Sequence, residues 1–359
     1  MTLSCTSSAP AGTAIRIYSA RELPQHAARW QAYVQRFGHM PLSRHPGWLN
    51  ALQSGLKHTP YCIEERDGDQ VCGLLPLAYI RSLLFGRFLV SLPYLNYGGV
   101  LANDDSTARR LLDQAVQLAD KLNVRYLEVR HERLVPHALV SQSSSHKINM
   151  RLTLPATKEQ LRKQLNGKVR NQVVKGERSD LTVHWGGHEL LAEFYQVFSQ
   201  HMRDLGTPVY GLALFRSILE TFPDRAELCV VRAGAQAAGA ALLLHGWGVT
   251  EVPSASTLRA FHHTCANMLM YWHLLQRAVD RGQRIFDFGR CSPDSNTFRF
   301  KKQWGAQPHE AVWQYYVRQG NVRDMRADNP KYDRFIRIWQ RLPVGLTRWI
   351  GPGIVRGIP

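Results

Sequence analysis

The sequence contains few of the features that mark secreted, metal-binding or membrane-spanning proteins. Its six cysteines include no CxxC pair, which argues against a disulfide framework and a zinc site. Its 15 histidines include no HExxH motif, so no metal site is expected. No run approaches the roughly 18 to 20 consecutive apolar residues that a transmembrane helix needs, and the first residues lack the basic and apolar segments of a secretory signal. We therefore expect a cytoplasmic protein with a disordered tail at residues 1–13.

Acidic residues are scarce relative to basic ones. The chain has 45 Lys and Arg against 28 Asp and Glu, a net charge of +17, of which +5 falls in residues 1–150 and +12 in residues 151–359. A positive excess concentrated in one half predicts an anionic partner there. Nucleic acid, nucleotide phosphates, phospholipid and anionic precursors are all candidates. A basic surface without any such partner is the alternative.

The length and the apolar periodicity indicate two folded domains. A chain of 359 residues with 44% hydrophobic residues is too long for one ordinary domain and has the composition of a folded protein. Periodicity predicts the element order β-α-α-β-β-β-α-β over residues 15–129, and the same order recurs over residues 181–288. We expect an α/β fold of mixed sheets with domains at 14–150 and 151–325, followed by a basic amphipathic tail at 326–359. The order resembles that of the acetyltransferase fold known as GNAT, here present twice.

Three expected strands lie at the limits of the two repeats. The fourth strand of the first repeat is expected at Gly98 to Ala102. The segment from Ile148 to Leu154 is a candidate for a strand that crosses between the halves. A last strand, Ala311 to Val317, continues past the point that matches the end of the first repeat.

A basic helix is the first candidate site. One long helix is expected from Lys158 to Arg178, with a kink at Asn166-Gly167 because glycine disfavours a helix interior. Its apolar residues fall on one arc and its basic residues on the opposite arc. We interpret Lys168 and Arg170 as a cradle for a substrate phosphate. A solvated helix surface is the alternative.

The second candidate site is formed by two neighbouring motifs, FDFGR at 286–290 and FRFKKQWG at 298–305. Asp287 lies at a strand end, where ligand sites of α/β folds form. Arg290 and Lys301 follow among aromatic residues. A kinase is not indicated, because no glycine-rich loop or HRD motif accompanies the Asp-Phe-Gly sequence. A loop held in place by its aromatic residues is the alternative.

The third candidate is SLPYLNYGGV at residues 91–100. Gly98 and Gly99 predict a turn or a close approach of the backbone. Tyr94, Asn96 and Tyr97 are candidates for substrate contacts, and a buried tyrosine turn is the alternative.

These motifs together resemble the FemAB family, specifically the FemAB-related proteins that accompany exosortase (PEP-CTERM) systems. The resemblance runs from about residue 15 to the end of the chain and is carried by SLPYLNYGGV, NGKVRNQVVKGE, NMLMYWHLLQRA with FDFGR, and FRFKKQWGA. It implies tandem GNAT-like domains and acyl or aminoacyl transfer onto an amine of a cell-envelope or exopolysaccharide precursor. It also implies no tightly bound cofactor. Phosphorylated or lipid-linked acceptors, tRNA or an acyl carrier would be the partners.

The resemblance also implies roles for individual residues. The Phe-Lys pair of the family's active centre corresponds to Phe300 and Lys301, and its phosphate-contacting helix carries Lys168 and Arg170. One departure is Ala266, where the family pattern has proline. The full set expected to bind substrate is Lys168, Arg170, Tyr97, Arg290, Asn267 and Tyr210.

The expected mechanism is direct attack by the acceptor amine. No GxSxG elbow or Cys-His pair is present, so a covalent acyl-enzyme is not indicated. Lys301 is expected to stabilise the oxyanion or hold a phosphate, and Asp287 to orient the amine or Arg290. The donor is open between aminoacyl-tRNA and an acyl thioester on CoA or a carrier protein.

A conventional CoA site is not expected. Residues 236–241 match the pyrophosphate-binding pattern of GNAT enzymes in form only, because they lie in an apparent hairpin. The turn from Leu258 to Asn267, which should carry the pattern, has no glycine. A GNAT-type N-acyltransferase with an acyl-CoA or carrier donor is one alternative. A non-catalytic protein that binds nucleic acid or a membrane is another, although nucleic-acid motifs are absent.

The C-terminal segment combines basic and aromatic residues. Residues 331–359 carry six basic side chains and one acidic. A helix is expected up to Leu342, with Phe335, Ile338, Trp339 and Leu342 on one face. This face either lies on an anionic membrane or docks on the second domain.

Overall fold

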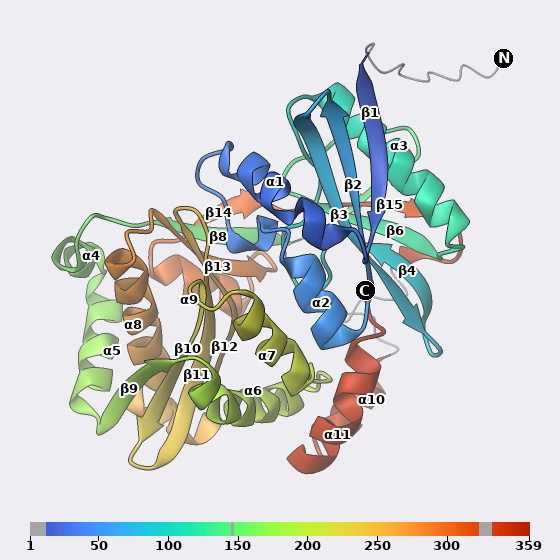
Figure 1. Cartoon of the computed structure of the whole chain (residues 1–359). Coiled ribbons are helices and arrows are strands. Elements are labelled where there is room, and N and C mark those ends of the chain that lie inside the picture. The colour runs from blue at the N-terminus through green and yellow to red at the C-terminus, as the bar shows by residue number, and fades with distance from the viewer. Residues whose placement is uncertain (1–11, 145–146, 323–331) are drawn as a thin grey trace.

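The computed structural model describes residues 12–144, 147–322 and 332–359. The tail expected at residues 1–13 therefore falls almost wholly outside the described residues, and the first strand already begins at Thr13. The described residues form two mixed sheets with helices packed on them (Figure 1). The α/β class expected from the sequence is confirmed.

The first sheet has the strand order β1-β2-β3-β4-β6-β15-β7. Its strands are β1 (Thr13–Ser19), β2 (Thr59–Asp67), β3 (Gln70–Ser82), β4 (Gly86–Val90), β6 (Tyr126–His131), β7 (Gln142–Ser144) and β15 (Val312–Val317), with β5 (Leu101–Ala102) paired to β3. Its helices are α1 (Leu23–Gln35), the 3-10 helix η1 (Leu42–Arg44), α2 (Trp48–Leu56) and α3 (Asp105–Lys121).

The second sheet has the order β14-β8-β13-β12-β11-β10-β9. Its strands are β8 (Ile148–Thr153), β9 (Leu181–Gly186), β10 (Ala226–Ala233), β11 (Gln236–His245), β12 (Val249–Thr257), β13 (Ile285–Cys291) and β14 (Gln307–Glu310). Its helices are α4 (Lys158–Gln164), α5 (Gly167–Arg178), η2 (His188–Leu190), α6 (Leu191–Leu205), α7 (Leu212–Thr221), η3 (Arg259–Thr264), α8 (Ala266–Asp280) and α9 (Asn296–Gln303). The β-α-α-β-β-β-α-β order recurs as predicted.

One hydrophobic core joins the two sheets. Alternate strand residues point to opposite faces, so Leu242 lies in the core shared with the first half and Leu243 in a core beneath α8. The shared core contains α1, α2, α6 and α7. Helix α2 approaches α7 closely at Gly55, where a Cβ atom would lie 2.7 Å from the Cα atom of Leu214. The two halves are therefore packed against each other through their helices.

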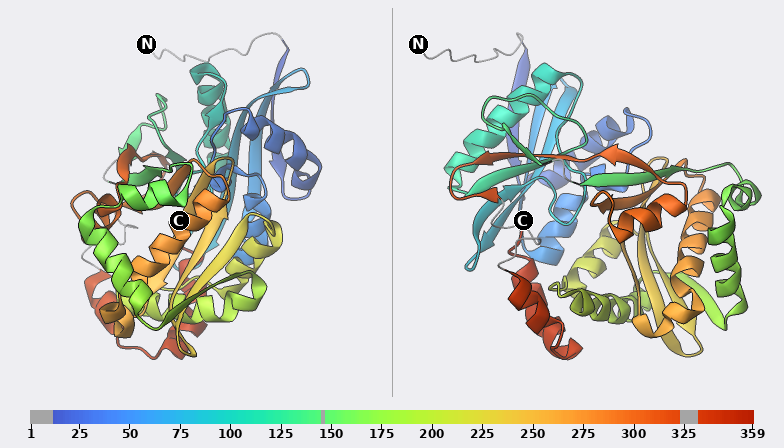
Figure 2. Two further views of the ribbon diagram at one scale, coloured as in Figure 1. Left: turned by 90° about the vertical axis from the view of Figure 1, so that its left-hand side faces the viewer. Right: turned by 180° about the vertical axis from the view of Figure 1, so that it is seen from behind.

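Two strands do not follow the expected division of the chain into two domains at residue 150. Strand β8 begins before residue 150, yet its partners β13 and β14 both belong to the second sheet, so its pairing does not show the crossing between the halves that was expected for this segment. Strand β15 falls in the range 151–325 assigned to the second domain, yet it pairs with β6 and β7 of the first sheet. In Figure 2 the chain runs from β14, which pairs with β8 in the second sheet, into β15 in the first sheet. The placement of this strand in the second domain is corrected, because its partners are long-range.

Two further expectations need correction. The fourth strand of the first repeat is β4, and the Gly98 to Ala102 segment contributes only the two-residue β5. The long basic helix is two helices, because Leu165 is extended and the Asn166 side chain accepts the amide of Val169 as a new N-cap. The FRFKKQWG motif is largely the helix α9, not a loop, and its N-cap Ser295 accepts the amide of Phe298 at 3.1 Å.

The C-terminal segment forms α10 (Asp333–Trp339) and α11 (Val344–Val355), seen at the lower edge of Figure 1. Helix α11 packs on α6, where Arg348 donates to the hydroxyl of Ser199 at 2.7 Å. The four apolar residues expected on one face of the helix are not equally buried, because Trp339 is buried while Ile338 is 54% exposed. Part of the segment therefore docks on the second half. Lys331 lies outside the described residues.

Candidate functional site

The candidate site lies where β12 and β13 separate. These parallel strands pair over only three positions, and Glu251 and Asp287 form the last pair. Side chains of paired residues share one face of a sheet. A hollow of about 50 Å³ opens here, lined by Tyr94, Leu95, Asn96, Glu251, Val252, Pro253, Asp287 and Gly289. The loop of the first half that contains SLPYLNYGGV therefore completes a site on the second sheet.

Asp287 is held by three hydrogen bonds. The Tyr97 hydroxyl and Arg151 Nε both donate to Oδ2, the latter at 3.0 Å. The amide of Gly289 donates to Oδ1 at 2.7 Å. Asp287 is 1% exposed, and burial raises the pKa of Tyr97 well above its usual value, so the phenol stays protonated. The contacts favour a positioning role for Asp287 and Tyr97.

A chain of charges extends from Asp287 into the first half. Arg151 also donates to Glu132 Oε1 at 2.5 Å, and Arg44 donates to Glu132 Oε2 at 3.1 Å. Arg44 reaches the tyrosine loop as well, because its Nη1 donates to the Gly99 carbonyl at 2.6 Å. Buried charges are tolerated when they are paired in this way. The network ties the loop to the second sheet.

The close packing of this loop leaves no room for a side chain at Gly99. A Cβ atom there would lie 2.6 Å from His131 Nδ1 and 2.7 Å from the Arg130 carbonyl oxygen. The close backbone approach predicted for this glycine is confirmed.

Glu251 is the acidic residue of the site that the sequence interpretation missed. It is 7% exposed, and its Oε2 accepts the amide of Ser43 at 2.9 Å. Burial, and secondarily the neighbouring Asp287, raises the pKa of Glu251 to about 7. The available signal was the single charged residue of a strand that is otherwise uncharged. A carboxyl group of this pKa can exchange a proton near neutral pH.

Lys301 lies beside the carboxylate pair. It is 5% exposed, and its Nζ donates to the carbonyl oxygens of Gly289 at 2.9 Å and Arg290 at 3.1 Å. Burial lowers the pKa of Lys301 to about 8. An ammonium group has three N–H donors, so two fix the end of β13 and one is left for a ligand.

Aromatic residues surround the lysine and the loop. The Phe300 ring lies 4.9 Å from that of Tyr271. The Tyr210 ring meets that of Tyr94 edge-on at 5.1 Å, and the Tyr94 hydroxyl lies 3.2 Å from that of Ser254. Phe300 therefore packs on the core of the second half beside Tyr271, while Tyr210 borders the tyrosine loop.

The other expected substrate-binding residues lie apart from the carboxylate pair. Asn267 is in the first turn of α8 and accepts the Thr257 hydroxyl at 3.2 Å. Lys168 and Arg170 are exposed on α5, and Arg170 donates to the Leu165 carbonyl at 3.1 Å. Among the described residues no hydrogen bond or ion pair joins Lys168 or Arg170 to Lys301. Their role in holding a phosphate stays a prediction.

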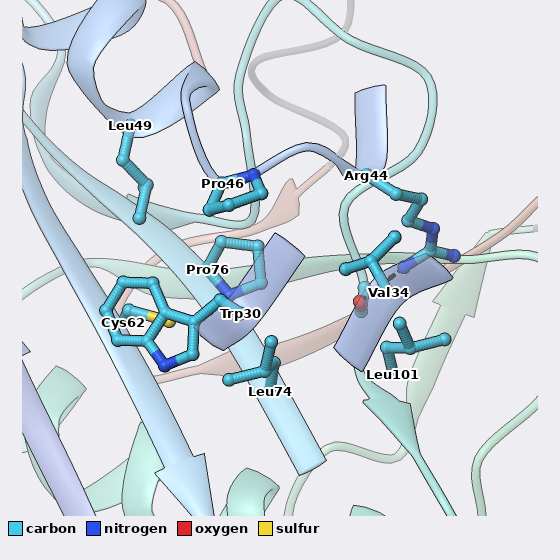
Figure 3. A pocket seen from close by; sticks show the side chains of 10 residues that line it. Trp30, Val34, Arg44, Pro46, Leu49, Cys62, Leu74, Pro76 and Leu101 are labelled. Carbon is cyan, nitrogen blue, oxygen red and sulfur yellow. Dashed lines mark hydrogen bonds between the residues drawn. The ribbon is translucent and has the colours of Figure 1, made fainter. Parts of the chain in front are cut away.

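A second hollow lies in the first half, between α1, α2 and strands β2 and β3. Its volume is about 20 Å³, and its lining comprises Trp30, Val34, Arg44, Pro46, Leu49, Cys62, Leu74, Pro76, Gly99 and Leu101. Figure 3 shows Arg44 on the side opposite Trp30 and Cys62. This space holds about one water molecule, which is too little for a substrate.

Neither of the two segments that could carry a pyrophosphate-binding loop forms one. Residues 236–241 lie within β11, which is paired on both sides. The Leu258 to Asn267 turn is occupied by η3. In the described ranges no group of three or more His, Cys, Asp or Glu is placed to hold a metal ion. The helices of those ranges include none that is long and apolar enough to span a membrane.

Comparison with known proteins agrees with this architecture. Residues 160–302 match the acetyltransferase (GNAT) domain family. The chain has no significant sequence match among curated proteins.

Solved structures show the same tandem arrangement. FemX is similar with a TM-score of 0.61 and 14% identity, over 82% of this chain and 96% of that one. A tandem GNAT protein from the clavulanic acid biosynthesis pathway is similar with a TM-score of 0.56 and 12% identity, over 86% of this chain and 100% of that one. The C-terminal domain of a putative lysylphosphatidylglycerol synthetase from Agrobacterium fabrum is similar with a TM-score of 0.53 and 11% identity, over 84% of this chain and 94% of that one. At these identities the similarity concerns the fold, and the tandem GNAT-like fold expected from the sequence is confirmed.

Proposed function

We propose that this chain is an acyltransferase that moves an acyl or aminoacyl group onto an amine of a cell-envelope or exopolysaccharide precursor. The observation that carries the proposal is the carboxylate pair of Glu251 and Asp287 at the separation of β12 and β13, with Lys301 hydrogen-bonded to the neighbouring Gly289 carbonyl. It supplies a buried carboxyl group that titrates near neutral pH and a buried ammonium group. The GNAT match over residues 160–302 supports the same reaction class.

In the proposed reaction Glu251 acts as the general base. Its carboxylate takes a proton from the acceptor ammonium, and the free amine attacks the carbonyl carbon of the donor ester or thioester. The remaining N–H of Lys301 stabilises the oxyanion of the tetrahedral intermediate. When the intermediate collapses, the bond to the leaving oxygen or sulfur breaks, and the leaving group takes the proton from Glu251. The nitrogen releases its second proton to solvent water, so the product is a neutral amide. No covalent enzyme intermediate is needed.

Asp287 and Tyr97 have positioning roles in this scheme. The three hydrogen bonds to Asp287 fix its charge beside Glu251. A fixed negative neighbour opposes ionisation of a second carboxyl group. Asp287 therefore keeps Glu251 a stronger base than an isolated glutamate. Removing Asp287 would weaken that base.

For the donor, we propose an aminoacyl ester or a thioester on a carrier in preference to free acyl-CoA. GNAT enzymes of the conventional type bind pyrophosphate with free backbone amides at a helix N-terminus. Here the formal match lies within the paired strand β11, and a 3-10 helix fills the turn before α8. The basic surface of the second half suits tRNA or an acidic carrier.

The donor is tested by supplying acetyl-CoA and alanyl-tRNA separately to the purified chain with an extract of envelope precursors. We expect the aminoacyl donor to be consumed and an amide product to appear in mass spectrometry, and only when the extract is present. The catalytically impaired Glu251→Gln variant is the matched control. Donor hydrolysis without an amide product would contradict transfer, and consumption of acetyl-CoA alone would overturn the donor assignment.

We further propose that the C-terminal helices contact an anionic membrane, which suits a lipid-linked acceptor. Trp349 is 80% exposed, and Phe335, Ile338 and Leu346 are exposed as well. Exposed aromatic and apolar residues among arginines are typical of helices that lie in a bilayer interface. The segment from 332 to 359 contains five arginines and one acidic residue.

Trp349→Glu tests this contact without disturbing the docked face, because the side chain points to solvent. We expect binding to vesicles that contain phosphatidylglycerol to fall several-fold while the melting temperature stays unchanged. Trp339→Glu is the contrasting variant, since Trp339 is buried, and it should lower the melting temperature. Vesicle binding by Trp349→Glu equal to that of the wild type would reject the membrane contact.

A further inference from the structure

Two arginines from different sheets meet on one tryptophan ring. The guanidinium carbon of Arg290, on β13, lies 3.6 Å from the ring centre of Trp313. That of Arg130, on β6, lies 4.1 Å from the same centre. Trp313 is on β15 and is the register partner of Arg130. The cluster therefore lies where the last strand of the chain joins the first half to the site strand β13.

The two arginines differ in their hydrogen bonds. Arg130 Nε donates to Glu128 Oε1 at 2.7 Å, and its Nη1 donates to the Leu95 carbonyl at 2.5 Å. No hydrogen bond or ion pair joins the Arg290 guanidinium to another described residue, although the side chain is half-buried. A guanidinium has five N–H donors. Arg290 therefore presents its donors without an acceptor.

The surroundings of Arg290 make its positive charge unfavourable. Burial, and secondarily the charge of Arg130, lowers the pKa of Arg290 to about 10. The carboxylate of Glu128 opposes this shift, but it is hydrogen-bonded to Arg130 and makes no hydrogen bond to Arg290. A partly buried charge without a hydrogen-bonded counter-ion costs stability, and the stack on Trp313 offsets only part of this cost. The Arg290 guanidinium can therefore accept an anion.

An independent observation indicates the same missing partner. The indole Nε1 of Trp313 is buried and has no hydrogen-bond partner among the described residues. An indole N–H only donates. Donors from two residues of one cluster therefore lack an acceptor.

We propose that Arg290 and Trp313 form a binding site for an oxyanion of the substrate, a phosphoryl or a carboxylate group. This inference rests on the proposed function and adds a substrate class to it. Planar guanidinium groups bind both oxyanions with two parallel hydrogen bonds. Arg290 lies on the same strand as Asp287, three residues further along β13, and Lys301 donates to its backbone carbonyl. The oxyanion identifies the substrate that is held while its amine or acyl group reacts.

Arg290→Met separates a ligand site from a structural stack. Methionine keeps an unbranched side chain on the Trp313 ring but removes the uncompensated charge. Without added anion we expect the melting temperature to rise by roughly 2 °C or more, as is typical when a functional charge is removed. Arg130→Met is the matched control, and it should lower the melting temperature because Glu128 and the Leu95 carbonyl lose their donor.

The ligand is tested with inorganic phosphate and with acetate, each titrated at constant ionic strength while the melting temperature is recorded. We expect one of the two to stabilise the wild type, since a ligand of the folded state raises stability. The same anion should have at least five-fold less effect on Arg290→Met. A response to phosphate assigns a phosphoryl group, and a response to acetate assigns a carboxylate.

Three results would overturn the proposal. These are a lower melting temperature of Arg290→Met without anion, equal stabilisation of both proteins, and no stabilisation of the wild type by either anion. None of these measurements depends on acyl transfer. Failure of the oxyanion site is therefore distinct from failure of the proposed function, which the donor experiment reports.

Discussion

Glu251→Gln is expected to lower the rate of transfer by about 100-fold or more, because general-base catalysis contributes roughly 10² to 10⁴ in rate. The wild-type rate should rise with pH through about 7, where Glu251 loses its proton. In the variant this rise should disappear, while any dependence due to the acceptor amine remains. The measurement is the pH profile of kcat/KM for both proteins with the same donor and acceptor.

The same variant has a stability signature that excludes misfolding. The pKa of Glu251 is raised from 4.5 to about 7 in the folded protein, so folding favours the protonated form. Its stabilising contribution is present below pH 4.5 and is lost as the pH rises through 7. Above pH 7 the wild type bears a penalty of about 3 kcal/mol at most.

We therefore expect Glu251→Gln to melt at a higher temperature than the wild type at pH 8, and this advantage to shrink at pH 5. A glutamine oxygen can still accept the amide of Ser43. Transfer within a few-fold of the wild type, or a rise with pH that persists in the variant, would remove Glu251 from the mechanism.

Lys301→Met should reduce kcat by roughly 10² to 10³, the usual loss when one donor to an oxyanion is removed. The variant also leaves the carbonyls of Gly289 and Arg290 without a donor. A buried carbonyl without a partner costs about 1 to 3 kcal/mol. Part of the effect is therefore structural, and the melting temperature must be measured beside the rate.

Lys301→Arg distinguishes the two contributions. Lys301 is protonated below about pH 8, so the wild-type rate should fall above that pH. An arginine stays charged throughout this range. The variant should lose the alkaline fall even if its absolute rate is lower. An alkaline fall that is identical in both proteins would assign it to another group, and Lys301 would then be a structural residue only.

Local patterns were sufficient to predict the repeat and part of the site. Apolar periodicity predicted the element order in both halves, since each amphipathic element buries one face whatever its partners are. The glycine pair also predicted the close approach at Gly99. These properties depend on a few neighbouring residues, so the sequence contains them directly. Asp287, which was expected at a strand end, lies inside β13 at the point where the pairing with β12 ends.

Two of the features that the sequence did not predict depend on long-range contacts. The importance of Glu251 follows from burial beside Asp287 and the amide of Ser43, which lies 208 residues away. The pairing of β15 with β6 joins residues far apart in the chain. The division of the basic helix was instead a local miss, because the extended Leu165 and the Asn166 cap were interpreted as a kink. Asn and Gly in succession signal a new helix start as well as a bend.

The position of β15 sets an order for the synthesis and folding of the chain. The place between β6 and β7 in the first sheet is filled by β15, residues 312–317. These residues leave the ribosome after every strand of the second sheet. An unpaired strand edge is prone to pair with other chains. The N-terminal half, although made first, therefore completes its sheet last, and the edge of β6 is exposed for most of translation.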